Sequence, residues 1–340
     1  MRELAGIVMV GVLLASGPAM AVEGSATTCA EATDQKACGE DLRRRALDDF
    51  DAAKSDADYR RVLEMFNEAF AAGATDAAYS IGYMTQFGHG VPADPTAATA
   101  FYRIAADAGN GDAIYKMGIA HEEGLGVEKD LGLALDWYRK GAALDHGECV
   151  NAIGVAYSNG LGVAVDDAEA GKWYLKAAEL GDPWGMKNAA DWLAEGRGGL
   201  AVDREKAFFW AEKSATTGLA EAKTRLGYFH LMGEGTAVNV AEAARLFREA
   251  AEAGHAVAMN NYGYMLQTGR GMTADPIGGF GWILKAAEAG DPNGMGNAAV
   301  AYREGKGVVA DKATARLWSE KAAAAGIVAE QQWLQSNPPE

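Results

Sequence analysis

Glycine pairs are the most regular residues in this chain that could do chemistry. Loops with two closely spaced glycines can cradle phosphate through their backbone N–H groups. The charge of the chain argues against phosphate binding, because 31 Lys and Arg residues are outnumbered by 47 Asp and Glu residues, which gives a formal net charge of −16. An anionic surface disfavours nucleic acid and anionic lipid, and it permits a basic partner segment. The pairs are Gly88/Gly90, Gly124/Gly126, Gly160/Gly162, Gly196/Gly198, Gly233/Gly235, Gly269/Gly271 and Gly305/Gly307.

The sequence shows no other pattern typical of a catalytic or metal site. It contains no GxxxxGK[ST], HExxH or SxxK motif, and carboxylate pairs such as Glu122-Glu123 are adjacent, as on a solvated helix face. His89, His146 and His255 fall in three different turns, whereas a zinc site needs convergent ligands. We therefore expect no catalytic residues, no cofactor and no metal.

Three cysteines offer thiol chemistry. Cys29 and Cys38 lie close together in a polar N-terminal stretch, and in an oxidising compartment such a pair favours a local disulfide. The alternative is two free thiols in a flexible arm. Cys149 occupies a position that alanine fills elsewhere in the chain, which indicates a buried small residue and not a nucleophile.

These residues belong to a repeat. The glycine pairs recur at a step of 36, with one step of 37 that we attribute to Gly199 as an inserted loop residue. Self-similarity at a fixed period of this size is typical of a solenoid. The residues that close each unit keep the same spacing: Gly73, Gly109, Asp145, Gly181, Gly218, Gly254, Gly290 and Gly326.

Each unit reads as two helices joined by the glycine pair. Residues 148–159 exemplify the first helix, with Gly154 allowing close approach of a neighbour. The second helix carries Trp173 and its equivalents, whose removal should cost roughly 3–5 kcal/mol if they fill the core. An N-cap residue begins the second helix in every unit: Asp94, Asp130, Asp166, Asp203, Asn239, Asp275 or Asp311. Capping boxes are expected where Glu169 and Glu242 follow.

At this point the pattern resembles the Sel1-like repeat family, relatives of the tetratricopeptide repeat. The resemblance covers roughly residues 76–326. It implies an all-α fold, a right-handed α/α solenoid of about seven 36-residue helix-turn-helix repeats used for protein–protein contacts, often in bacterial envelope or virulence settings. The second unit carries the motif most fully, at Ala113, Met117, Gly118, Gly124, Gly126, Val127, Asp130, Ala134, Trp137 and Tyr138.

The remaining segments flank this array. Residues 1–21 combine a charged start, an apolar run and an Ala-Met-Ala cleavage signal, which predicts a signal peptide and no stable membrane anchor. Residues 22–41 form the arm with the possible disulfide. Residues 42–73 look like a degenerate capping repeat, residues 74–326 hold the seven repeats, and residues 327–340 provide a C-terminal capping helix and tail.

The leading functional hypothesis is an exported, non-catalytic scaffold that binds a protein or peptide, with basic segments permitted. By analogy with tetratricopeptide geometry, the first helix of each unit lines the concave face. A β-lactam-binding or β-lactam-hydrolysing enzyme and a peptidoglycan-binding or other glycan-binding module are the alternatives. The expected groove residues are Tyr79, Tyr83, Tyr115, Asn151, Trp184, Tyr228, Asn260 and Tyr264.

Export is a testable prediction of the sequence alone. Signal cleavage after Ala21 should give a periplasmic or secreted protein that begins near Val22. N-terminal sequencing of the protein from an envelope fraction checks this, and recovery of intact Met1 would contradict it.

Overall fold

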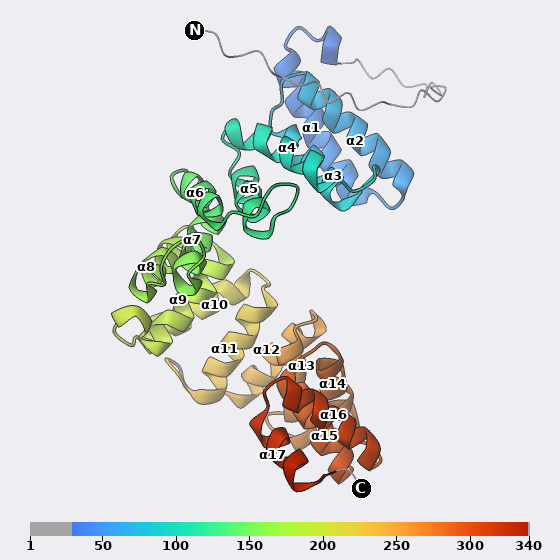
Figure 1. Cartoon of the computed structure of the whole chain (residues 1–340), viewed down its shortest axis with the longest axis vertical. Coiled ribbons are helices and arrows are strands. Elements are labelled where there is room, and N and C mark those ends of the chain that lie inside the picture. Colours follow the sequence, from blue (N-terminus) through green and yellow to red (C-terminus); the bar gives the residue numbers. More distant parts are fainter. Residues whose placement is uncertain (1–28, 339–340) are drawn as a thin grey trace. The chain divides into compact units, whose positions relative to one another are not determined.

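The computed structural model describes residues 29–338, and all regular structure in that range is helical (Figure 1). The predicted signal peptide and the start of the predicted arm lie outside the described residues. The helices are η1 (Cys29–Glu31), α1 (Gln35–Ala52), α2 (Asp56–Ala71), α3 (Ala77–Phe87), α4 (Pro95–Asp107), α5 (Gly111–Glu123), α6 (Leu131–Ala142), α7 (Gly147–Asn159), α8 (Asp167–Glu179), α9 (Pro183–Glu195), η2 (Arg197–Gly199), α10 (Arg204–Thr216), α11 (Ala220–Met232), α12 (Val240–Glu252), α13 (Ala256–Thr268), α14 (Pro276–Glu288), α15 (Pro292–Glu304), α16 (Lys312–Ala324) and α17 (Val328–Ser336).

The chain divides into two compact units, the first ending at Ala74 and the second beginning at Thr75. In the first unit α1 packs against α2. Helix α1 already begins at Gln35, inside the segment assigned to the arm, because the Asp34 carboxylate accepts the Ala37 N–H and caps it. The sulfur atoms of Cys29 and Cys38 are joined at 2.07 Å, which ties η1 to α1.

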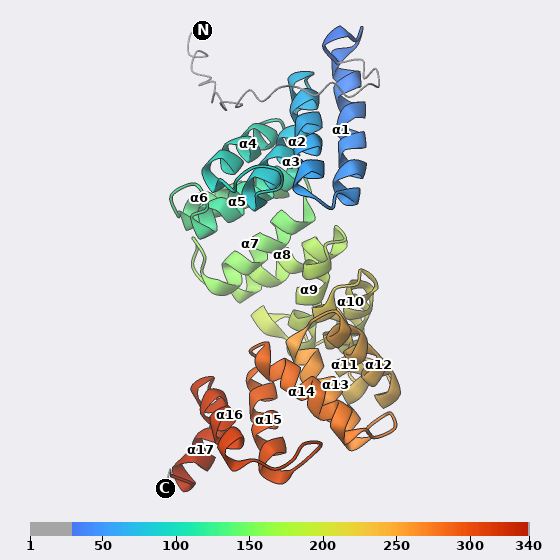
Figure 2. The same cartoon turned by 90° about the vertical axis from the view of Figure 1, so that its right-hand side faces the viewer.

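The second unit is the predicted array of helix pairs (Figure 2). We call the first helix of each pair an A helix (α3, α5, α7, α9, α11, α13 and α15) and the second a B helix (α4, α6, α8, α10, α12, α14 and α16). Each A helix packs on its own B helix, and each B helix packs on the next A helix. This sequential packing among the described helices is that of an all-α solenoid.

The two glycines of each pair have different tasks. Gly160 ends α7 in the left-handed region, at φ 72° and ψ 36°, and its N–H donates to Ala156 O. Gly162 also has a positive φ, and a Cβ there would overlap the carbonyl group of Leu131 at the start of the preceding B helix. The first glycine therefore ends the A helix, and the second lets two backbone segments approach closely. Both have structural roles, which accounts for the glycine pairs without a phosphate cradle.

The predicted N-caps are confirmed, but the predicted capping boxes are wrong. The Asp166 carboxylate accepts the N–H groups of Ala168 and Glu169. Its own N–H, which Glu169 would need to bind in a capping box, already donates to Tyr157 O at 3.0 Å. The Glu169 carboxylate pairs instead with Lys172 of the same helix, and the bond from the Asp166 N–H to Tyr157 O takes the place of the capping-box bond.

The core of each repeat is built on one contact, a small residue of the A helix against a side chain of the B helix. A Cβ at Gly154 would lie 2.7 Å from Tyr174 Cδ1, so the Tyr174 ring lies directly on the α7 backbone. The same arrangement pairs Gly82 with Tyr102, Gly118 with Tyr138, Gly227 with Phe247 and Gly263 with Ile283. Where the A-helix residue is Ala190 or Ala299, the B-helix residue in register is small, Ala211 or Ser319.

This contact corrects the expectation for Trp173. Tyr174 is buried, whereas Trp173 is only half-buried, with the Lys176 ammonium 5.8 Å from the centre of its ring. The equivalent position is buried where it holds Trp137, Leu246 or Trp318, so the partial exposure of Trp173 belongs to its own repeat. Tyr174 is therefore the residue whose loss opens a core cavity.

The last helix closes the array through a buried ion pair. The Glu330 carboxylate on α17 receives two hydrogen bonds from the Arg303 guanidinium of α15, at 2.7 and 2.8 Å. The guanidinium also lies 4.6 Å from the centre of the Trp333 ring. The predicted C-terminal capping helix thus covers the last repeat, as expected for a terminal element of a solenoid.

Glycine substitutions test the core contact. Gly154→Ala should lower the free energy of unfolding by about 1–3 kcal/mol, because the added methyl overpacks against Tyr174. Gly281→Ala is the matched control, since its Cβ would meet nothing within 4 Å in a helix of normal φ, and it should raise stability by about 1 kcal/mol. Urea unfolding measures both, and a stabilised Gly154→Ala variant would disprove the contact.

A pH dependence follows from Glu330. Burial alone would raise the pKa of this carboxyl, but hydrogen bonds from Arg303 and Ser319 and the Arg303 charge together hold the pKa below its ordinary value of 4.5. A lowered folded-state pKa contributes stability that is fully present above pH 4.5 and is lost as the pH falls through the folded-state value.

Glu330→Gln should loosen α17 by roughly 3 kcal/mol at pH 7 and remove this acid-range dependence. Hydrogen exchange of residues 328–336 measures both effects. Glu320→Gln is the control, because Glu320 is exposed and pairs with Arg316 within one helix. Equal protection of α17 in the wild type and in Glu330→Gln would show that the ion pair does not hold the cap.

Candidate partner-binding face

Most consecutive A helices in the second unit contact one another, and we call this line of helices the A-helix row. Helix α7 contacts both α5 and α9, α9 contacts α11, and α13 contacts α15. No pair of consecutive B helices in the described part of the chain makes contacts of the same extent. Elements that approach one another more closely lie on the inner side of a curved stack, so the A helices form the inner face of this unit.

Several of the predicted groove residues join consecutive A helices. The Asn151 side-chain oxygen accepts a hydrogen bond from Asn188 Nδ2 at 2.9 Å, and Asn260 accepts one from Asn297 at 2.8 Å. Asn260 is only 6% exposed, so its assignment to the partner surface is wrong. A buried amide must be hydrogen-bonded within the fold, and its partner here is the next repeat.

The tyrosines of the expected groove are mostly held by the fold as well. Tyr228 packs edge-on against Phe247 and accepts a hydrogen bond from Asn261 Nδ2 at 2.6 Å. The ring of Tyr83 lies 4.7 Å from that of Phe87 and 6.1 Å from that of His89. Both remain partly accessible, so they can present an edge of the ring while packing with the rest.

Two predicted residues offer large free surfaces. Trp184 at the start of α9 is 42% exposed, and Tyr264 on α13 is 49% exposed. Exposed aromatic rings of this size are the side chains that contribute most to protein interfaces. Between them, α9 and α11 are joined by Asp191, which forms ion pairs with Lys187 at 2.9 Å and with Arg225 at 2.6 Å.

The N-terminal end of the row carries an acidic aromatic cluster. Burial raises the pKa of both Tyr79 and Tyr115 to about 12, and the charges of Asp112 and Glu148 add to the shift of Tyr79. Asp112 and Glu148 are themselves exposed, with more than half of each side chain accessible. This end of the face therefore presents negative charge next to aromatic surface.

Sequence reasoning missed how this cluster is assembled. His146 Nε2 lies 3.0 Å from Asp112 Oδ1 and 3.2 Å from Glu148 Oε2. The hydrogen bond with Asp112 raises the pKa of His146 and lowers that of Asp112. The prediction that no ligand-type side chains converge is therefore wrong here. The signal was available in the repeat register, because equivalent ends of consecutive A helices come together.

Cys149 is a buried residue and not a nucleophile, as its position in the repeat indicated. Its side chain is completely buried, and a Cβ on Gly141 would overlap its sulfur. Burial raises the pKa of the thiol to about 12, whereas a nucleophilic cysteine needs a lowered pKa.

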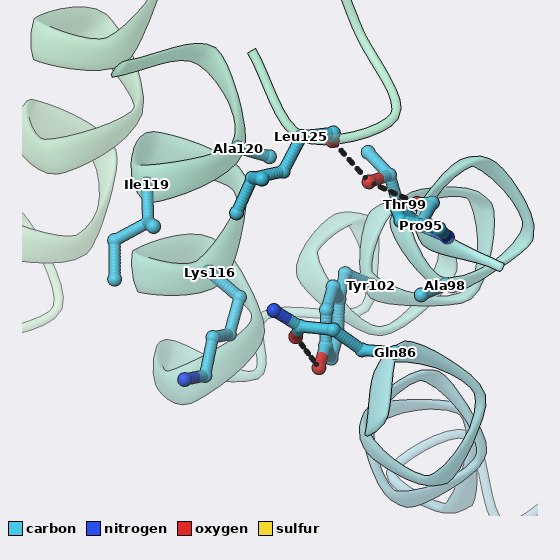
Figure 3. A pocket seen from close by; sticks show the side chains of 9 residues that line it. All are labelled: Gln86, Pro95, Ala98, Thr99, Tyr102, Lys116, Ile119, Ala120 and Leu125. Atoms are coloured by element: carbon cyan, nitrogen blue, oxygen red, sulfur yellow. Dashed lines mark hydrogen bonds between the residues drawn. The ribbon is translucent and has the colours of Figure 1, made fainter. Parts of the chain in front are cut away.

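Two cavities lie between helices of the second unit, the first where α3, α4 and α5 meet. The first, of about 30 Å³, has room for roughly one water molecule. Among its lining residues, the Tyr102 hydroxyl donates a hydrogen bond to Gln86 Oε1 and the Thr99 hydroxyl donates one to Leu125 O (Figure 3). The second, of about 540 Å³, lies on the B-helix side beside the 37-residue repeat and is lined by Leu175, Glu179, Leu193, Leu200, Ala201, Asp203, Lys206, Phe209 and Trp210. None of the predicted groove residues lines either cavity.

No helix among the described residues is both long and apolar enough to cross a lipid bilayer.

Comparison with known proteins connects this architecture to a family. The chain is similar to c5321, described as a protective antigen in uropathogenic Escherichia coli strains that displays an SLR fold, with 28% identity and a TM-score of 0.64 over 88% of this chain and 64% of that one. It is also similar to a Sel1 repeat protein from Oxalobacter formigenes, with 25% identity and a TM-score of 0.59 over 88% and 86% of the two chains. No curated protein matches the chain.

The family model of the Sel1 repeat matches the chain seven times in tandem. Sel1 repeats generally mediate protein–protein interaction. The matched ranges are 75–110, 111–146, 147–182, 185–218, 220–255, 256–291 and 292–327, which together cover most of the sequence. Because the matched repeats coincide with the helix pairs of the second unit, the chain belongs to the Sel1 repeat family.

Proposed function

We propose that this protein is an exported, non-catalytic scaffold that binds an extended segment of another protein along the A-helix row. The observation that supports this most is the combination of Trp184 and Tyr264, both exposed on A helices, with polar side chains between them. An extended peptide can use such a row, with the exposed aromatic rings as anchors that supply contact area.

Charge supports a basic partner segment. The chain carries a formal net charge of −16, and Lys187 and Arg225 in the middle of the A-helix row are paired with Asp191. Asp112 and Glu148 at its N-terminal end are more than half exposed and share one histidine, so two carboxylates leave net negative charge there. Opposite charges steer encounter and fix the direction of the bound segment.

The paired substitution Trp184→Ala with Tyr264→Ala tests the face. Both side chains are half or nearly half exposed, so the fold should survive, while retention of partner from an envelope extract should fall at least about tenfold. Ile277→Ala with Val309→Ala is the matched control, because it removes exposed apolar side chains away from the A helices. Circular dichroism reports the fold of each variant.

Retention in the paired variant equal to that in the control would move the interface off the A-helix row. The cavity beside Phe209 and Trp210 would then be the next surface to test, because it joins aromatic and charged lining residues. Purified peptidoglycan added to the same capture distinguishes glycan from protein binding, and nitrocefin turnover tests the β-lactamase alternative. An excess of peptidoglycan that releases the captured material would contradict a protein partner.

A further inference from the structure

Asp112, His146 and Glu148 form the one group of metal-ligand side chains that converges within the described residues. One ligand atom from each side chain lies within 4.8 Å of both others. His146 Nε2 is the centre of the group, at 3.0 Å from Asp112 Oδ1 and 3.2 Å from Glu148 Oε2. In a tetrahedral zinc site with metal–ligand bonds of 2.0–2.2 Å, two ligand atoms lie about 3.4 Å apart, and these nitrogen–oxygen distances are close to that separation.

The fold orients the imidazole for this group. His146 is the N-cap residue of α7, and its ring lies against the start of α5, where a Cβ on Gly111 would overlap the ring. Nδ1 is the buried nitrogen and has no hydrogen-bond partner among the described residues, so Nε2 is the edge that faces the two carboxylates. Glycine at position 111 is thus what allows the histidine of one repeat to reach the aspartate of the repeat before it.

Electrostatics also favours a cation here. Two carboxylates face one imidazole, and the carboxylate of Asp182 contributes further negative charge at His146. The N-termini of α5 and α7 carry a partial positive charge of about half a unit each, which is less than the charge of the two carboxylates. Both carboxylates are more than half exposed, so they can move the remaining distance toward an ion at little cost.

We propose that Asp112, His146 and Glu148 bind a divalent transition-metal cation, with Zn²⁺ as the best-matched ion, across the junction of two consecutive repeats. One nitrogen and two carboxylate oxygens suit zinc and its neighbours, whereas magnesium and calcium prefer oxygen alone. Three protein ligands leave a further position for water. This site stands on its own residues and does not depend on the proposed peptide-binding function.

The chain supplies its own control. His255 occupies the same N-cap position on α13, and Glu221 stands where Asp112 stands in its repeat. The third ligand is missing, because Val257 replaces Glu148, and His255 Nδ1 instead lies 2.7 Å from Thr224 Oγ1. The same histidine position therefore occurs once with a complete ligand set and once without it.

Isothermal titration of the tag-free, chelator-treated chain with zinc chloride tests the site. The wild type should bind one Zn²⁺ at this site, His146→Ala and Glu148→Gln should each weaken that binding at least about tenfold, and His255→Ala should leave it unchanged. Magnesium chloride should give no comparable binding. Circular dichroism confirms that each variant is folded.

Three outcomes would overturn the proposal. They are absence of zinc binding by the wild type, unchanged zinc binding in folded His146→Ala, and binding of Mg²⁺ as tight as that of Zn²⁺. Gly111→Ala provides a second variant that keeps all three ligands and displaces only the imidazole, so it too should weaken zinc binding. Unaltered zinc affinity in folded Gly111→Ala would contradict the role given to that glycine.

Discussion

The contact between an A-helix glycine and a B-helix side chain is the constraint on which the repeats depend. Tyr174 can lie on the backbone of α7 only because Gly154 has no side chain. The ring then fills the space between the two helices that a larger A-helix residue would occupy. In the repeats of Ala190 and Ala299 the opposing residues are Ala211 and Ser319. A larger A-helix residue is thus matched by a smaller B-helix residue, which keeps the separation of the two helices.

The polar side chains of the A helices mainly connect one repeat to the next. Asn151 with Asn188 and Asn260 with Asn297 use uncharged amides, whereas Asp191 with Arg225 and His146 with Asp112 use charge. A residue that varies between repeats can therefore encode the junction between neighbours as well as the choice of partner. Variable positions on the A-helix row therefore include residues that bind the next repeat, so not every variable position is free to contact a partner.

The sequence predicts what is local and repeated. The period, the glycine turns and the N-cap at Asp166 depend on backbone preferences within a few residues, and the structure confirms them. The sequence misjudges Trp173 against Tyr174, because adjacent positions on a helix cannot be ranked without knowing the angle of the neighbouring helix. The repeat register brings the helix ends around His146 together, but it does not give the direction of the imidazole, which is what makes the side chains converge.

The burial of Cys149 has a consequence for covalent bonding elsewhere in the chain. A thiol with a pKa of about 12 and no exposed surface supplies almost no thiolate, and thiolate is the species that attacks a disulfide. Once α7 has packed against its neighbours, the odd cysteine is removed from exchange with the bond between Cys29 and Cys38. Correct pairing is then protected by the formation of the third repeat, and mispairing is confined to chains in which that repeat has not yet formed.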